Sequence, residues 1–136
     1  MTALFADTFY WIALADPTDS AHRLALTLTA ERATSQIVTT DEVLTEYLNS
    51  FSSAPAPSRS QAAAVVEDLL TSSIVRVLPQ SRASFRAGLQ LYRDRPDKGY
   101  SLVDCVSMQT MKREGLTEVL TNDKHFEQEG FRALFR

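Results

Sequence analysis

Short apolar segments alternate along the whole chain with longer segments of helical periodicity. The strand-like segments hold three to five residues each, at 4–6, 36–39, 74–78, 118–121 and 131–135. Helices are expected between them at 8–15, 20–32, 39–51, 59–72, 81–95 and 101–114, with a short helical turn before the last strand. This alternation predicts an α/β fold: a mostly parallel five-stranded sheet covered on both faces, which is a three-layer α/β/α sandwich.

Three local signals place the ends of these helices. Residues Thr39 to Glu42 have the spacing of a capping box, so the helix there is expected to begin at Thr39. The segment 52–58, rich in Ser, Ala and Pro, is expected to be a loop. Gly115 is expected to end the helix that begins near Ser101.

Length and composition limit the class of protein. With 136 residues and 44% hydrophobic residues, the chain is expected to form one domain over 1–136 with its own core. No apolar run reaches the ~20 residues that a membrane span needs, and no basic region precedes an apolar one as in a signal peptide. The single cysteine, Cys105, excludes an internal disulfide, and a cytoplasmic location is expected. A net charge of −3 argues against general polyanion binding.

Three aspartates stand almost alone among apolar residues. Asp7 is the only charged residue before Asp16, and Asp104 is the only one between Lys98 and Lys112. A third, Asp123, follows the apolar segment that begins at residue 118. Because parallel strands end at the same edge of a sheet, we expect these carboxylates to meet there. Such a cluster is costly without a cation, and carboxylate oxygens are the ligands that Mg²⁺ and Mn²⁺ prefer.

A fourth acid is expected from the helix after the second strand. With residues placed at 100° intervals, the apolar stripe of that helix centres near Tyr47 and Phe51. Glu46 lies on the flank of the stripe and can reach inward, whereas Glu42 points away and fits the capping box. Glu46 is therefore the fourth candidate ligand.

Each acid also has a purely structural explanation. Asp7 can cap the following helix, and Asp104 can form a capping box with Ser101, which is compatible with metal binding. Asp123 can form an Asx-turn, and Glu46 can be a solvated helix residue. His22 and His125 are interpreted as surface or packing residues, Cys105 as a core residue, and the aromatic residues Phe9, Tyr10 and Trp11 as core or dimer contacts.

Four segments together resemble a known family. They are Phe5 to Thr8, Val43 to Asn49, Asp97 to Cys105, and Leu120 to Phe126 with Gly130 and Phe131. In this order and spacing they resemble a PIN-domain ribonuclease, and within that family the VapC-type toxins of toxin–antitoxin pairs. The resemblance covers nearly the whole chain. It implies an α/β/α fold and Mg²⁺- or Mn²⁺-dependent endoribonuclease activity on an RNA such as tRNA or mRNA. It also implies a homodimer and a small protein antitoxin as partner.

The resemblance also assigns roles to residues. Asp7 and Asp104 would be the principal metal ligands, and Glu46 and Asp123 would complete the acidic cluster, with Asp123 serving a second metal or a bridging water. Hydroxyls that orient these carboxylates would come from Thr8, Ser101 and Thr121. One departure is Phe9, which stands where the family commonly has a small polar residue, and it is expected to alter water or phosphate contacts near Asp7.

Most of the positive charge of the chain comes from arginine, which makes up eleven of the 14 basic residues. Arg93, Arg95 and Lys98 are candidates to hold RNA phosphates at the pocket rim, or else they form a solvated charged run.

Two other functions are considered for this chain. One rival function is that of a weakly active or inactive PIN-fold module that binds RNA or protein. Another is phosphoryl transfer through Asp7, which usually needs an acid two residues later, where this chain has Phe9.

Overall fold

The fold is organised around a parallel β-sheet. The computed structural model describes residues 2–136, and its five strands lie in the order β3-β2-β1-β4-β5, with every pairing parallel. The strands are β1 (Ala3–Ala6), β2 (Gln36–Thr40), β3 (Val75–Leu78), β4 (Glu118–Leu120) and β5 (Arg132–Ala133). The predicted α/β class and the parallel sheet are therefore confirmed.

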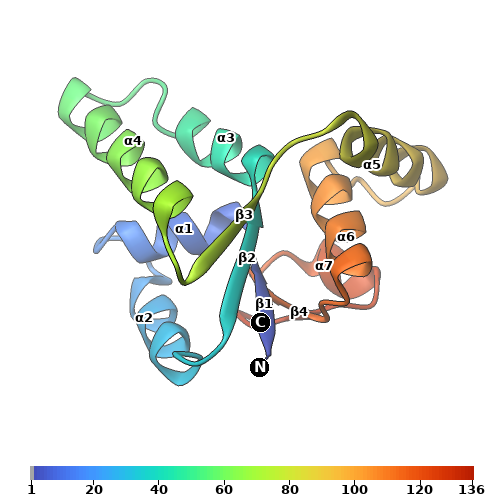
Figure 1. Ribbon diagram of the computed structural model, residues 1–136, viewed down its shortest axis with the longest axis horizontal. Coiled ribbons are helices and arrows are strands. Elements are labelled where there is room, and N and C mark those ends of the chain that lie inside the picture. Colours follow the sequence, from blue (N-terminus) through green and yellow to red (C-terminus); the bar gives the residue numbers. More distant parts are fainter. Residues whose placement is uncertain (1) are drawn as a thin grey trace.

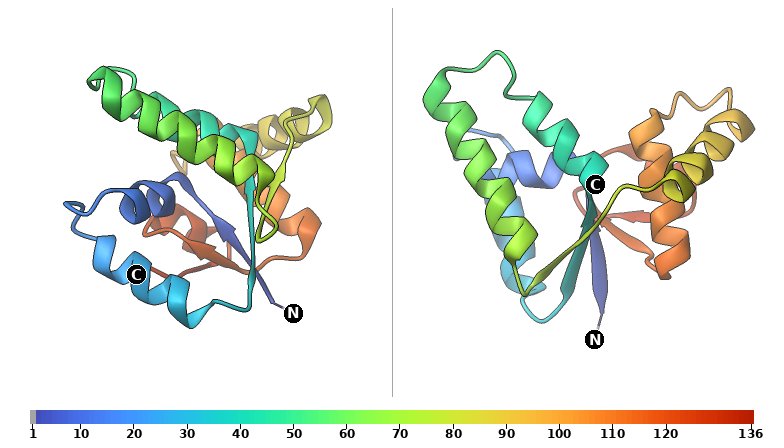
Figure 2. Two further views of the ribbon diagram at one scale, coloured as in Figure 1. Left: turned by 60° about the vertical axis from the view of Figure 1, so that its left-hand side comes forward. Right: turned by 45° about the horizontal axis from the view of Figure 1, so that its top comes forward.

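Helices cover both faces of this sheet. Figures 1 and 2 show α1 to α4 on one side of the sheet and α5 to α7 on the other, which confirms the three layers. The helices are α1 (Thr8–Ala15), α2 (His22–Glu31), α3 (Asp41–Asn49), α4 (Ala56–Thr71), α5 (Arg82–Asp94), α6 (Leu102–Glu114) and α7 (Lys124–Gln128). No helix among residues 2–136 is both long enough and apolar enough to cross a membrane.

The central strand β1 is buried on both faces. Leu4, Phe5 and Ala6 are all at most 1% exposed, as expected for a strand with helices above and below it. The largest side chains around it are Tyr10, Tyr47 and Phe126, which are equally buried. This two-sided packing fixes the position of the carboxyl end of β1, where Asp7 follows.

The predicted capping box at Thr39 is wrong. Thr39 belongs to β2 and is fully buried, and its hydroxyl donates to the carbonyl of Ala6 at 2.9 Å. The N-cap of α3 is Thr40, whose hydroxyl accepts from the Val43 backbone N–H. Because the Thr39 side chain bonds to β1, β2 extends one residue further than predicted, to Thr40. The N-cap of α3 therefore also lies one residue later than predicted. Glu42 therefore has no capping-box role.

The proline-rich loop is shorter than predicted. Helix α4 begins at Ala56 instead of Arg59, with Pro55 as its N-cap and Pro57 in its first turn. The first backbone N–H groups of a helix have no partner within it, so proline is tolerated there. By contrast, α6 ends where the sequence predicts, with Gly115 at φ 71° in the left-handed region.

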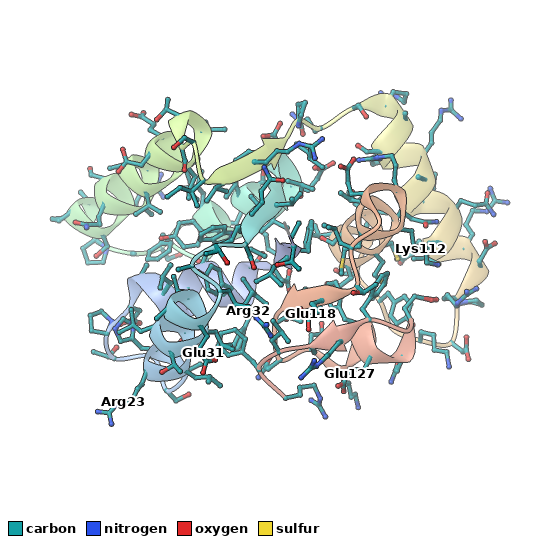
Figure 3. All side chains as sticks on the ribbon, turned by 60° about the horizontal axis from the view of Figure 1, so that its bottom comes forward. Arg23, Glu31, Arg32, Lys112, Glu118 and Glu127 are labelled. Carbon is teal, nitrogen blue, oxygen red and sulfur yellow. The ribbon has the colours of Figure 1, made fainter. Side chains whose placement is uncertain are left out.

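The amino edge of the sheet is tied to α2 by charge. Glu118, the first residue of β4, lies beside the helix C-cap residue Arg32, and the guanidinium and carboxylate are 3.8 Å apart. Figure 3 shows the two side chains next to each other. A partly exposed pair of this kind contributes about 0–1 kcal/mol.

Replacing Gly88 by alanine is expected to destabilise the fold. A Cβ at Gly88 would lie 2.5 Å from Val106 Cγ2 and 3.1 Å from the Val106 backbone, so α5 would have to move away from α6. Overpacking of this kind typically costs about 1–3 kcal/mol. Urea unfolding of Gly88→Ala should show this loss, and Gly88→Ala combined with Val106→Ala should recover part of it. Unchanged stability of the single variant would contradict the close contact.

Candidate active site

The site is built where β1 and β4 end side by side. Ala6 pairs with Leu120 in the parallel register, so Asp7 and Thr121 leave the sheet at the same level. The Thr121 hydroxyl donates to Asp7 Oδ2 at 2.9 Å. The chain runs from β1 outward to β2 and β3 on one side and to β4 and β5 on the other, so β1 and β4 flank the switch in strand order. Ligands of open parallel sheets bind at such a point.

A pocket of about 560 Å³ opens at this edge. Every acid and hydroxyl residue predicted for the site lines it, although they come from four separate parts of the chain. The predicted residues are Asp7, Thr8, Glu46, Ser101, Asp104, Thr121 and Asp123, and the pocket also includes Phe9, Asn122, Lys124 and Arg136. The proximity of these side chains is a feature of the structure, while their roles toward a metal stay a prediction.

Asp7 is the buried acid of the pocket. It occupies the N-cap position of α1, but its side chain makes no capping hydrogen bond there. Only 6% of the residue is exposed. The pKa of Asp7 is raised from 3.8 to about 7, mainly by burial and in part by the nearby carboxylates of Asp104 and Glu46, against the hydrogen bond from Thr121. The simple capping explanation is therefore insufficient for this residue.

Glu46 reaches the pocket from α3. It accepts a hydrogen bond from the hydroxyl of Thr8, which is the first residue of α1. The same hydroxyl lies 3.4 Å from the Val43 carbonyl oxygen, so α1 and α3 are joined at this point. Thr8 therefore contacts Glu46, whereas Thr121 is the hydroxyl that contacts Asp7.

Asp104 enters from the first turn of α6. It forms the capping box expected from the sequence: Ser101 Oγ accepts from the Asp104 backbone N–H at 3.0 Å, and Asp104 Oδ2 accepts from the Ser101 backbone N–H at 3.2 Å. The side chain is still 14% exposed and lines the pocket. Burial raises its pKa, and the charges of Asp123 and Glu46 add to this effect. Helix capping and a place in the pocket thus coexist in one side chain.

Asp123 and His125 complete the acidic end of the pocket. Asp123 caps α7 by accepting from the His125 backbone N–H at 2.9 Å. The imidazole Nδ1 of His125 lies 3.2 Å from Asp123 Oδ1 and 3.9 Å from Asp104 Oδ2. One candidate ligand atom from each of these three residues falls within 4.8 Å of the others. The sequence pattern indicated only that His125 lies near Asp123, since a position two residues along the chain does not reveal where a side chain points.

The family of this chain follows from its match to a protein-family model. The family model described as the PIN domain matches residues 4–131, nearly the whole chain. The chain belongs to the PIN domain family. The resemblance predicted from its four sequence segments is therefore confirmed at the level of the family. A comparison with curated proteins finds no match.

Solved structures share the fold of this PIN domain. VapC20 from Mycobacterium tuberculosis, a toxin that cleaves the sarcin–ricin loop, has a TM-score of 0.83 and 24% identity, with 94% of this chain and 95% of that chain covered. VapBC2 from Rickettsia felis, solved with a promoter DNA fragment, has a TM-score of 0.67 and 15% identity over 97% of both chains. FitAcB from Neisseria gonorrhoeae has a TM-score of 0.65 and 18% identity, with 96% and 95% covered. At these identities the likeness concerns the fold.

The donor set of this PIN domain suits a divalent cation. Four carboxylates line one pocket, and burial together with mutual repulsion raises the pKa of two of them, Asp7 and Asp104. Ionised carboxylates at this density destabilise the protein unless positive charge compensates them. Hard cations with oxygen ligands supply that charge. Asp7, Glu46, Asp104 and Asp123 would therefore be the residues that hold a metal.

The basic residues of the pocket are not those expected from the sequence. Lys124 and Arg136 line the pocket, whereas none of Arg93, Arg95 and Lys98 does. Arg95 Nε instead donates to Glu129 Oε1 at 2.7 Å, and Lys98 lies 4.0 Å from Asp97. RNA contacts by these three residues therefore stay a prediction. Lys124 could have been predicted as a pocket residue because it directly follows Asp123 in the sequence. No sequence pattern near Arg136 indicates that this residue lies at the site.

Proposed function

We propose that this PIN domain is an Mg²⁺- or Mn²⁺-dependent endoribonuclease that hydrolyses RNA phosphodiester bonds. The observation that carries the proposal is the buried Asp7 carboxylate in one pocket with Asp104, Glu46 and Asp123. An acid that is 6% exposed and has three further acids nearby is an unfavourable arrangement in a protein that binds no cation. Membership of the PIN domain family supports the same chemistry.

Different residues of the pocket would bind the metal, orient its ligands and hold the RNA. Asp7 and Asp104 would bind the cation, and the Thr121 hydroxyl holds the Asp7 carboxylate in one orientation. The Thr8 hydroxyl does the same for Glu46. Bound Mg²⁺ or Mn²⁺ would supply Lewis acidity, which activates water and neutralises negative charge that develops on the phosphate. Lys124 lines the pocket and would hold an RNA phosphate at its rim, and Arg136, which also pairs with Glu127 at 2.8 Å, would assist it.

The biological role that fits this activity is that of a toxin in a toxin–antitoxin pair. One solved structure with this fold, VapC20, is a toxin that cleaves the sarcin–ricin loop, and VapBC2 and FitAcB have the same fold. We propose that the protein acts in the cytoplasm as a homodimer and is inhibited by a small antitoxin. Co-purification with the product of a short neighbouring gene, with loss of RNA cleavage in the complex, would test this role.

RNA cleavage with controlled metal content tests the enzymatic proposal. The purified protein would be freed of metal with EDTA and incubated with tRNA, mRNA and a sarcin–ricin loop oligonucleotide, each with and without added Mg²⁺ or Mn²⁺. Cleavage of at least one RNA only when metal is present is the expected result. Calorimetry that detects no Mn²⁺ binding at millimolar concentration, together with no cleavage of any RNA, would instead favour an inactive module that binds RNA or protein.

Removing the charge of Lys124 is expected to weaken RNA binding without removing the chemistry. Lys124 lines the pocket and forms no ion pair among the described residues, so its ammonium group is free to approach a phosphate. Lys124→Ala should raise KM by about three- to tenfold, leave kcat within about twofold, and reduce the salt dependence of binding by about one phosphate contact. The matched control is Lys112→Ala on α6, outside the pocket. Equal effects of the two variants would contradict a local role for Lys124.

A further inference from the structure

The imidazole of His125 is placed as a ligand instead of a surface group. Its Nδ1 atom is buried and has no hydrogen-bond partner among residues 2–136. Yet this atom lies 3.2 Å from Asp123 Oδ1 and 3.9 Å from Asp104 Oδ2. A buried nitrogen left without a hydrogen bond is costly, and most such atoms in proteins have a partner. A cation shared by the nitrogen and the two carboxylates would provide one.

The ring is also held in one orientation. Tyr100 packs against it edge to face, with ring centroids 5.4 Å apart and an interplanar angle of 62°. On the opposite edge of the ring, Nε2 lies beside Gly99, where an added Cβ would be 4.0 Å from it. Tyr100, in the loop before α6, therefore packs on the ring. Nδ1 is the ring nitrogen that lies close to Asp104 and Asp123.

We infer that Asp104, Asp123 and His125 form a second cation subsite that takes Mn²⁺ in preference to Mg²⁺, with His125 Nδ1 as its nitrogen ligand. Mg²⁺ demands oxygen ligands in near-octahedral geometry and gives up water reluctantly, so an imidazole ligand disfavours it. First-row transition ions accept imidazole together with carboxylate. The inference rests on the proposed function, because Asp104 would serve this subsite as well as the one at Asp7.

The nitrogen ligand can be tested directly in the unmodified protein. One would add Mn²⁺ in steps up to about two equivalents, enough to fill both proposed sites of the metal-free wild-type protein, and record the electron spin-echo envelope modulation. The expected result is a modulation from a directly bound ¹⁴N nucleus, which changes to the ¹⁵N pattern when the protein is labelled with ¹⁵N-histidine. Bound Mn²⁺ without nitrogen modulation would overturn the inference.

Two variants separate His125 from the rest of the protein. His125→Phe keeps a ring against Tyr100 but removes the nitrogen, and should lose the modulation and weaken Mn²⁺ binding by about tenfold or more. Mg²⁺ affinity should change by less than about twofold, because the oxygen ligands remain. His22→Gln removes the other histidine, whose Nδ1 lies 2.8 Å from the Ala13 carbonyl oxygen, and should leave the modulation unchanged.

The outcomes distinguish this inference from the proposed function. RNA cleavage that depends on metal, combined with Mn²⁺ spectra free of nitrogen coupling, would leave the nuclease in place and remove His125 as a ligand. Absence of Mn²⁺ binding and of cleavage would remove both. If His125→Phe fails to fold, as judged by circular dichroism, the isotope-labelled wild-type protein still decides the question.

Discussion

Asp104→Asn is expected to lower metal-dependent RNA cleavage by at least about 1000-fold, which corresponds to about 4 kcal/mol of transition-state stabilisation. Asp104 lies in the pocket with all three other acids, and its charge acts on Asp7 while the charges of Asp123 and Glu46 act on it. An amide in its place removes one negative charge and one anionic ligand from the centre of the cluster. The loss should therefore appear in kcat and in metal affinity together, measured with a saturating RNA substrate and by calorimetry.

The fold should survive this change. The side-chain oxygen of asparagine can still accept from the Ser101 backbone N–H, so the capping box of α6 is retained. The matched control is Asp97→Asn, which makes the same change at a side chain that is 75% exposed and whose one ion pair within residues 2–136 is with Lys98. Near-normal cleavage by Asp104→Asn, or an equal loss in the Asp97 variant, would contradict the proposed role of Asp104.

Asp7→Asn is expected to stabilise the metal-free protein at pH 8 while abolishing activity. The folded-state pKa of Asp7 is raised from 3.8 to about 7, so the folded protein binds this proton more tightly than the unfolded chain does. Folding stability from this group is therefore fully present below pH 3.8 and is lost as the pH rises through about 7. A shift of this size corresponds to at most about 4 kcal/mol.

Thermal unfolding across this pH range measures the effect. With EDTA present, the two proteins should have similar Tm values near pH 4, and Asp7→Asn should unfold about 5–10 °C higher at pH 8. The burial of Asp104 raises its pKa as well, so the wild-type protein should lose further stability in the same direction. Added Mn²⁺ should raise the Tm of the wild-type protein at pH 8 by more than that of the variant, which keeps only the cation subsite of Asp104, Asp123 and His125. A wild-type protein more stable than the variant at pH 8 without metal would contradict this prediction.

Much of the fold follows from local sequence patterns. Short continuous apolar segments alternate with segments of 3.6-residue periodicity, and a chain of this kind buries both faces of its strands in a covered parallel sheet. Gly115 ended its helix as predicted because it adopts a left-handed conformation that other residues rarely do. The N-cap of α3 was misplaced by one residue, at Thr39 instead of Thr40, because the Thr39 hydroxyl bonds to the neighbouring strand, a partner 33 residues away in sequence.

The acids of the site could be chosen from the sequence because they are chemically out of place. Asp7 and Asp104 are isolated charges in apolar segments, and Asp123 directly follows an apolar strand. Burial of a charged group is costly, so such positions stand out without any knowledge of the fold. Arg93 and Arg95 lacked this signal, because arginines in a polar helical segment are common on any protein surface.

By itself, the sequence determined the class of fold and the four acidic residues, since periodicity and misplaced charge are local properties of the chain. The tertiary structure alone decided which groups meet. The β1–β4 register sets the Thr121 hydroxyl against Asp7, and the packing of α1 on α3 brings the Thr8 hydroxyl to Glu46. The first turn of α7 places His125 beside Asp104 and Asp123. Hydrogen bonds and metal ligation act over a few ångströms, and the residues involved are up to 114 positions apart in the chain.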